Sequence, residues 1–314
     1  MRKKLITAVT LLSLLSPVAI AQASTTDTPV LAILDTAIDT TLPQFKDKIV
    51  GEVCILEWAL CPNGTKFQEG PGSASMPANL ISQNGFEHGT LMTDVAIKSN
   101  PSLKVLFIKI IGNSAAGLRK PTGESTISAA LFWVKENAAK YNIQAVSLAQ
   151  GTHTLGKAGT NYCPTYPRVI SAIDSLLSMD IPVFAATGNN RDYQRIDWPS
   201  CVPNAVAVAA VDQINEMTTY SNTDPLLTDF FALGNMQATA PGNISKNIAG
   251  TSASTQVAAA QYLIASKQFG YKGQKLIDKL KSISLPTIGR QGKFTKLMSL
   301  VDISSSTTKV ATRG

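Results

Sequence analysis

Four residues of this sequence could together transfer an acyl group through a serine. Ser252 lies in the segment AGTSAS, His88 in EHGT, Asp35 in LDTAID and Asn189 in AATGNN. A serine hydroxyl attacks a carbonyl only when a base takes its proton and an acid orients that base. The oxyanion that forms needs hydrogen-bond donors, which an asparagine amide can supply. The four residue types therefore match the parts that such a reaction requires.

The order of these residues restricts the arrangement that they can form. The chain runs acid, histidine, serine, whereas α/β-hydrolases run serine, acid, histidine and chymotrypsin runs histidine, acid, serine. The sequence contains two histidines, His88 and His153, and both precede Ser252. An α/β-hydrolase arrangement therefore cannot be built on Ser252.

Taken one at a time, the same residues have structural explanations. Asp35 could be a turn or capping acid, and asparagine, as at Asn189, is common in turns. His88 and Ser252 could each begin a helix, and His153 is expected to be a loop residue. The catalytic interpretation depends on all four occurring together and in this order.

Apolar runs alternate with helical patterns along the chain. The runs are short, β-branched and apolar throughout, as strands covered on both faces are, and span residues 30–34, 105–110, 144–148, 182–186 and 205–211. Helical spacing of apolar residues occurs over 125–141 and 168–179, and small residues over 253–265 predict a buried helix after Ser252. This alternation predicts an α/β fold, a doubly wound parallel sheet with helices on both faces. Asp35 and Asn189 each follow a strand, at the edge where such sheets hold their sites.

Seven segments, and an eighth, ATAPG, between the last two of them, resemble in order those of the subtilisin-like (subtilase) serine proteases. The resemblance runs from about Val30 to about Asp302 and includes ATAPG near the serine. The seven segments are VLAILDTAID, EHGT, PSLKVLFIKIIG, VSLAQG, IPVFAATGNN, WPSCVPNAVAVAAVD and AGTSAS. The resemblance implies a subtilisin-like fold and a serine endopeptidase that hydrolyses peptide bonds. In that enzyme Asp35, His88 and Ser252 would form the catalytic triad, and the Asn189 amide would stabilise the oxyanion.

The same resemblance implies where a polypeptide substrate would bind. VSLAQG matches the family's substrate-binding strand, so Ser147, Leu148 and Ala149 are expected to lie beside an extended substrate backbone. Ala149 and Gln150 stand where the family usually has glycines. The rim of the substrate cleft should therefore carry extra side chains.

Asp197 is the residue that we expect to affect specificity. Aligning Trp198-Pro199 with the family's aromatic–proline pair puts Asp197 at the floor of the S1 pocket, where subtilases commonly have a glycine. A carboxylate in an apolar pocket favours a substrate Lys or Arg at P1, which would pair with it. The alternative is an acid turned outward that pairs with Arg191 or Arg195.

Some positions depart from the family pattern. Ala37 replaces the glycine after the catalytic Asp-Ser/Thr, and Gln256 replaces the proline four residues after the nucleophile. The departures leave open a catalytically silent binding or regulatory protein of the same fold. Sedolisins share GTSAS but use glutamate and aspartate where this chain has His88 and Asn189. We therefore expect a neutral-to-alkaline enzyme, because its base is an unprotonated imidazole.

Residues 1–23 have the features of a secretory signal peptide. They hold three basic residues, an apolar run over 5–20 and the small-residue site Ala21-Gln22-Ala23. We expect cleavage after Ala23, a peptidase domain over 24–303 and a polar, disordered tail over 304–314. The product would be secreted or periplasmic. No later apolar run approaches the roughly 20 residues of a membrane-spanning helix, so no span is expected in the mature chain.

Composition and charge limit the classes of partner. The 314 residues are 44% hydrophobic, enough for one large core. The formal net charge is +7, and removal of the signal peptide with its three basic residues lowers it to +4. This charge is too small to indicate nucleic-acid binding. About six residues separate Ala23 from Val30, which leaves no room for a pro-segment. We therefore expect the exported chain either to fold unaided, with two disulfides limiting the unfolded ensemble, or to rely on a separate inhibitor or folding partner.

The four cysteines are expected to form disulfides, because export implies an oxidising environment. Three pairings are possible, and we favour Cys54 with Cys61 and Cys163 with Cys201. Cys54 and Cys61 enclose a short loop, and the resemblance places Cys163 and Cys201 beside the substrate cleft. No C-x-x-C pair or histidine cluster is present, so no metal site or other cofactor is expected.

The first prediction concerns calcium. The aspartate of the family's strongest calcium site is Gln44 here, and residues 98–100 lead directly into the next strand without a ligand-bearing loop. Because calcium requires several oxygen ligands with carboxylates among them, EDTA should leave the melting temperature nearly unchanged. Thermal unfolding with and without EDTA, followed by calcium addition, measures this. A large decrease that calcium reverses would contradict it.

Overall fold

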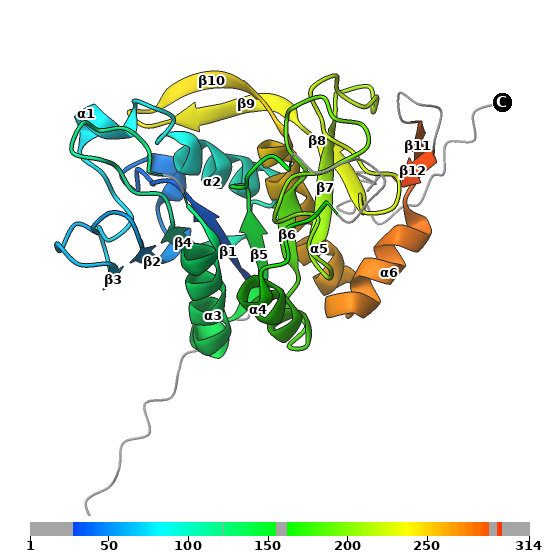
Figure 1. Ribbon diagram of the computed structural model, residues 1–314, viewed down its shortest axis with the longest axis horizontal. Coiled ribbons are helices and arrows are strands. Elements are labelled where there is room, and N and C mark those ends of the chain that lie inside the picture. Colours follow the sequence, from blue (N-terminus) through cyan, green and yellow to red (C-terminus); the bar gives the residue numbers. More distant parts are fainter. Residues whose placement is uncertain (1–27, 121, 155–161, 289–293, 297–314) are drawn as a thin grey trace, which may run out of the picture.

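A computed structural model describes residues 28–120, 122–154, 162–288 and 294–296 (Figure 1). The expected signal peptide, 1–23, and the expected tail, 304–314, lie outside the described residues. Eight strands form one sheet in the order β3-β2-β4-β1-β5-β6-β7-β8. They are β1 Val30–Asp35, β2 Ile49–Ile55, β3 Phe67–Glu69, β4 Lys104–Lys109, β5 Ile143–Leu148, β6 Val183–Ala186, β7 Val206–Val211 and β8 Phe230–Leu233.

The predicted parallel α/β sheet is confirmed. Every strand pair in it is parallel except β2 with β3. The five predicted strands correspond to β1, β4, β5, β6 and β7. β2 was not predicted because Gly51 and Glu52 interrupt its apolar run. Glu52 is nevertheless buried, and its carboxylate accepts hydrogen bonds from the backbone N–H groups of Gly72 and Ala74 at 3.1 and 3.3 Å.

Helices cover both faces of the sheet, as predicted (Figure 1). The helices are α2 His88–Ser99 and α5 Thr251–Phe269 on one face, and α3 Glu124–Tyr141 and α4 Pro167–Leu177 on the other. Side chains alternate along a strand, so Leu31 and Ile33 of β1 pack in the core of the first face. Val30, Ala32 and Leu34 pack in the core of the second face. Burial on both sides explains why β1 is apolar throughout.

The helix predicted after the candidate nucleophile is α5. It begins at Thr251, so Ser252 lies in its first turn. Most of α5 is buried, since it contacts strands β5 to β8 on one side and α2 on the other. Small residues allow this close packing, and the larger Tyr262 is fully buried, with its hydroxyl accepting a hydrogen bond from Gly273 N at 2.6 Å. α5 therefore anchors the serine from the centre of the domain.

The remaining elements lie around this core. β9 and β10 form an antiparallel hairpin that lies across α2 (Figure 1). The elements are the short helices η1 Pro43–Phe45 and α1 Ala78–Ile81, the hairpin strands β9 Asn235–Ala240 and β10 Ile244–Ala249, helix α6 Gly273–Ile283, and an antiparallel pair, β11 Pro286–Ile288 with β12 Phe294–Lys296. None of these had been predicted from the sequence.

Both expected disulfides are present. Cys54 bonds to Cys61 and Cys163 bonds to Cys201. The second closes a loop of 38 residues and the first a loop of 7. By loop-closure entropy the longer crosslink stabilises the fold by about 4 kcal/mol and the shorter by about 2.

Gln44, which stands where the family's strongest calcium site has an aspartate, makes a hydrogen bond within the chain. Its Nε2 donates a hydrogen bond to Asp94 Oδ1 at 3.3 Å. The Asp94 carboxylate also accepts from Thr239 N and pairs with Lys98, both at 2.7 Å. Within the described ranges, no group of three or more His, Cys, Asp or Glu side chains is placed to hold a metal ion.

In the same ranges no helix is long and apolar enough to cross a membrane.

Lys109 is a buried cation at the end of β4. It is in register with Asp35 of β1 and Cys54 of β2, and 3% of its surface is exposed. Its Nζ donates a hydrogen bond to Ser75 O at 3.3 Å. Burial lowers the pKa of this amine to about 8. The ammonium form is therefore disfavoured in the folded protein relative to the unfolded chain.

The second prediction follows from this burial. Between about pH 8 and 10.5 the unfolded chain binds more protons at Lys109 than the folded one, so the free energy of unfolding should rise with pH. Lys109→Met should remove that rise and increase stability at pH 7 by roughly 1–3 kcal/mol. Urea unfolding of Ser252→Ala protein at pH 7, 9 and 10 measures both effects. The exposed Lys46→Met should change neither, and an equal pH slope in Lys109→Met and its parent would contradict the prediction.

Candidate active site

Asp35 is fixed at the junction of β1 and α2. The side chain is fully buried, and Oδ1 accepts a hydrogen bond from Thr36 N at 2.7 Å. The Thr36 hydroxyl donates to Phe86 O at 2.7 Å and accepts from Gly89 N at 2.9 Å. These bonds attach the end of the strand to the first turn of the helix.

Gly89 allows that helix to begin so close to β1. A Cβ at this position would lie 2.4 Å from Ala37 O and 2.5 Å from Phe107 Cζ, so only glycine fits. The preceding residue, His88, is the first of α2. The glycine of EHGT therefore brings the imidazole up to the end of the strand.

The His88 imidazole contacts both oxygens of the Asp35 carboxylate. Its Nδ1 lies 2.8 Å from Oδ1 and 2.9 Å from Oδ2. Because a carboxylate accepts hydrogen bonds, Nδ1 carries the proton and Nε2 of the neutral ring keeps a free lone pair. The side chain of His88 is 26% exposed, whereas that of Asp35 is fully buried. The ring therefore has a bound edge and an accessible edge.

Ser252 reaches the same edge of the sheet from α5. Its hydroxyl donates a hydrogen bond to Ala149 O at 3.3 Å, and in the described part of the chain it makes none to His88. Gln150, the residue after Ala149, has its Nε2 atom 3.1 Å from His88 Nδ1. Consecutive residues after β5 thus contact the serine and the histidine. The structure brings Asp35 and His88 into direct contact, and it relates Ser252 to them through the neighbouring residues Ala149 and Gln150.

Asn189 lies in the exposed loop after β6 with its amide group oriented by Thr251. Its Oδ1 accepts hydrogen bonds from Thr251 N at 2.9 Å and Thr251 Oγ1 at 3.1 Å. The NH2 group is therefore left to donate elsewhere. A Cβ on Gly250 would lie 3.5 Å from Asn189 Nδ2 and 3.8 Å from Ser252 N. The two nitrogens border one small space that the glycine leaves open.

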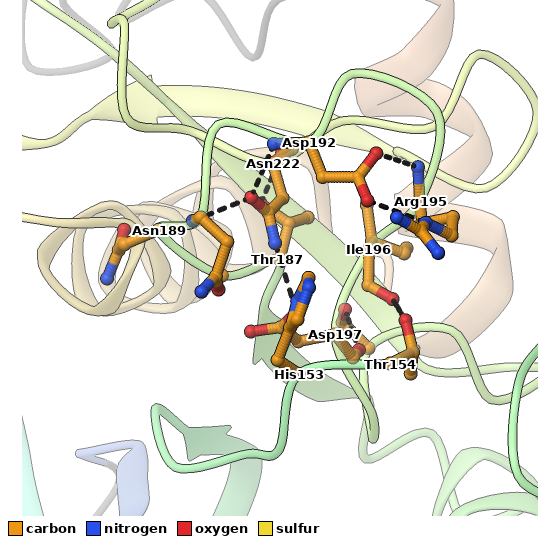
Figure 2. Close-up of polar contacts among 12 residues, drawn as sticks. His153, Thr154, Thr187, Asn189, Asp192, Arg195, Ile196, Asp197 and Asn222 are labelled. Carbon is orange, nitrogen blue, oxygen red and sulfur yellow. Dashed lines mark hydrogen bonds and ion pairs between the residues drawn. The ribbon is translucent and has the colours of Figure 1, made fainter. Parts of the chain in front are cut away.

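Asp197 forms a second carboxylate–imidazole pair close to Asn189 (Figure 2). Its Oδ1 lies 2.9 Å from His153 Nδ1 and 3.0 Å from Asn222 Nδ2. Its Oδ2 packs on Gly188, where an added Cβ would lie 2.1 Å from it. Burial raises the pKa of the Asp197 carboxyl, and the hydrogen bond from His153 opposes that shift. With 9% of the residue exposed, Asp197 is not the outward-turned acid considered as the alternative.

Asn222 connects this pair to the loop that carries Asn189. Its Oδ1 accepts hydrogen bonds from the N–H groups of Asn190 at 2.8 Å and Asp192 at 3.0 Å, and the side chain is fully buried (Figure 2). Sequence reasoning did not identify Asn222, because no motif marks it. His153 lies in a loop, as expected, but its bond to Asp197 was not predicted.

The residues expected to bind substrate differ in their surroundings. Ser147 and Leu148 lie inside β5, fully buried and paired with β1 on one side and β6 on the other. Ala149 follows the strand, and its carbonyl faces Ser252. Of the three, Ala149 is the one placed at the serine.

This arrangement defines a class of protein. An imidazole paired with a buried carboxylate lies at the carboxyl edge of a parallel sheet, and a helix carries a serine at the same edge, which are the group types that serine peptidases use. The chain belongs to the subtilase family of peptidases, whose family model matches residues 26–281. It is therefore a subtilisin-like serine endopeptidase, and its substrates are polypeptides.

Individual relatives agree with that membership. Subtilisin Savinase of Lederbergia lenta is 28% identical over 222 residues, which cover 67% of this chain and 75% of Savinase. The alkaline protease of Shouchella clausii is also 28% identical over 222 residues, but this chain spans about half of that relative, 53% of its length.

Solved structures show the same fold. A cold adapted subtilisin-like serine proteinase is similar with a TM-score of 0.64 and 17% identity, covering 88% of this chain and 90% of that one. A mutant of the protease domain of PatA gives a TM-score of 0.66 at 17% identity, with 88% and 92% covered. At these identities the similarity is one of fold.

Proposed function

We propose that the chain cleaves peptide bonds with Ser252 as nucleophile, His88 as general base and acid, and Asp35 as the group that orients the imidazole. The observation that carries this proposal is the contact of His88 Nδ1 with both Asp35 oxygens, at 2.8 and 2.9 Å. It leaves Nε2 as the basic atom on the accessible edge of the ring.

The serine needs one movement to enter this arrangement. Its hydroxyl donates to Ala149 O, and in the proposed mechanism it would leave that acceptor and turn towards the imidazole by rotation about the Cα–Cβ bond. Catalytic hydrogen bonds commonly tighten only when substrate binds. The hydroxyl proton then passes to His88 Nε2 as Ser252 Oγ attacks the carbonyl carbon, and His88 later gives the proton to the leaving amine.

The oxyanion would occupy the space beside Gly250. Asn189 Nδ2 and Ser252 N border that space, and Asn189 Oδ1 is already bonded to Thr251. A donor held in this way does not have to reorganise as charge develops, and one such contact contributes roughly 3–4 kcal/mol to lowering the barrier.

The substrate would lie as an extended strand along the segment after β5. Ala149 supplies the part of the predicted Ser147–Leu148–Ala149 segment that faces the serine. Backbone pairing of this kind accepts many side chains, which fits a polypeptide substrate. Selectivity would then depend on the S1 pocket, for which we propose Asp197, since its Oδ2 lies against Gly188, next to Asn189.

We further propose that the chain is exported and cleaved after Ala23, giving a peptidase domain over 24–303. The basic and apolar pattern of residues 1–23 supports export. The exported chain would either fold unaided or use a separate inhibitor or folding partner.

The alternative is a catalytically silent protein of the same fold that binds or regulates. The hydrogen bond of Ser252 to Ala149 O instead of His88 is the observation in its favour. A serine-directed phosphonate separates the two functions, because it forms a stable bond only to a nucleophilic serine. Labelling of wild type but not of Ser252→Ala supports the enzyme, and no labelling of either supports the silent protein.

The third prediction concerns catalysis. Ser252→Ala and His88→Ala should reduce peptide hydrolysis to the residual level of a broken triad. Asn189→Ala should lower kcat by about 100-fold to 1,000-fold with little change in KM, because its amide acts only on the oxyanion. Steady-state kinetics on a peptide substrate measure these effects, with the exposed neighbour Asn190→Ala as control. Equal activity of Ser252→Ala and wild type would disprove the assignment.

The fourth prediction concerns specificity. Peptides with Lys or Arg at P1 should be cleaved preferentially, because Asp197 Oδ2 can pair with the substrate cation. Asp197→Gly should shift the preference to large apolar P1 residues. Removing the imidazole in His153→Ala should strengthen the preference for cations, because Asp197 then loses its partner. A P1 library measures all three, and wild type that prefers Phe or Leu over Arg would refute the role of Asp197.

A further inference from the structure

Gln150 lies between the Asp35–His88 pair and the guanidinium group of Arg119. Its Nε2 donates a hydrogen bond to Asp35 Oδ1 at 3.0 Å and lies 3.1 Å from His88 Nδ1. Its Oε1 accepts a hydrogen bond from Arg119 Nη2 at 2.6 Å. Gln150 is 8% exposed, so its hydrogen bond to Asp35 forms away from bulk water. A side chain where the family usually has glycine thus touches both acid and base.

The direction of the Gln150 amide is determined by Arg119. A guanidinium group has donors and no acceptor, so the amide oxygen must face it. Nε2 therefore faces Asp35 and can only donate to the carboxylate. The charged donor on one side polarises the amide and strengthens its donation on the other side.

Arg119 is held in place although its side chain is exposed. Its backbone forms a β-bridge with Asn113, and Asn84 Nδ2 donates to the carbonyl of nearby Gly117 at 3.1 Å. The guanidinium packs on Gly85, where an added Cβ would lie 3.2 Å from Nη1. Gly85 precedes His88 by three residues. The loop with Arg119 therefore packs against the segment that leads into the catalytic helix.

We propose that Gln150 and Arg119 are positioning residues that draw negative charge from Asp35 and thereby keep His88 unprotonated at lower pH. The proposal rests on the proposed triad. A hydrogen bond to Oδ1 stabilises the carboxylate, so less of its charge is available to stabilise an imidazolium. Because the base must be neutral, the pair extends activity towards acid pH.

Other charged groups near the Asp35–His88 pair have their own partners. Glu87, next to His88, pairs with Lys246 of β10 at 2.7 Å. Lys109, in register with Asp35 on β4, donates to Ser75 O. Among the residues that the structure describes, Arg119 is thus the cation that hydrogen bonds link, through Gln150, to the Asp35–His88 pair.

Two variants remove the link without removing a catalytic group. Gln150→Leu keeps most of the volume and loses both hydrogen bonds, and Arg119→Met removes the exposed cation. Arg119→Lys is the conservative variant and should keep part of the effect. Lys120→Met removes an equal charge from the same loop and is the matched control.

The readout is the protonation of His88 followed by NMR in a Ser252→Ala background. The sequence has two histidines, so His153→Ala assigns the signals. The titration midpoint of His88 should move up by about half to one pH unit in Gln150→Leu, and by less in Arg119→Met. The acid limb of kcat/KM against pH in active protein should move with it, while KM at high pH changes little.

The outcomes separate this proposal from the proposed function. A shift in Gln150→Leu and Arg119→Met with none in Lys120→Met supports the positioning role. An unchanged or lowered midpoint in both variants, or an equal shift in Lys120→Met, overturns it. If Gln150→Leu does not fold, Arg119→Met alone decides. Failure of wild type to react with the phosphonate would instead refute the catalytic assignment, and the NMR titration remains valid in that case.

Discussion

A carboxylate without exposed surface holds the active edge of this molecule together. Burying the ionised Asp35 side chain would cost several kcal/mol without compensating hydrogen bonds. Three donors compensate it: Thr36 N from its own turn, His88 Nδ1 from α2 and Gln150 Nε2 from the segment after β5. Each comes from a different part of the chain. Satisfying one buried charge therefore also aligns β1, α2 and the segment after β5.

The parallel sheet makes this convergence possible. β1, β5 and β6 run in the same direction, so the segments that follow them emerge at one edge. α5 brings Ser252 to that edge as well, although Ser252 follows Asp35 by 217 residues in the sequence. Asn222, fully buried, joins the Asn189 loop to Asp197, so the candidate oxyanion donor and S1 pocket are parts of one hydrogen-bonded unit.

The sequence predicted those features that have a local signature. Continuous apolar runs identified β1 and β4 to β7, and small residues identified α5, because burial on both sides imposes both patterns. β2 was missed because Glu52 is satisfied by backbone groups some 20 residues away. The four candidate catalytic residues stood in recognisable segments. Gln150 appeared only as an added side chain at the rim, because its bond to Asp35 spans 115 residues and no local pattern encodes it.

Both histidines of the sequence sit at this one edge, each bound to a buried carboxylate. The two imidazole–carboxylate pairs therefore lie in the same part of the molecule, while the Lys, Arg, Asp and Glu side chains of the outer surface lie elsewhere. Covalent modification of either imidazole would alter the electrostatic potential of the cleft while the solubility and surface adsorption of the protein stay nearly constant.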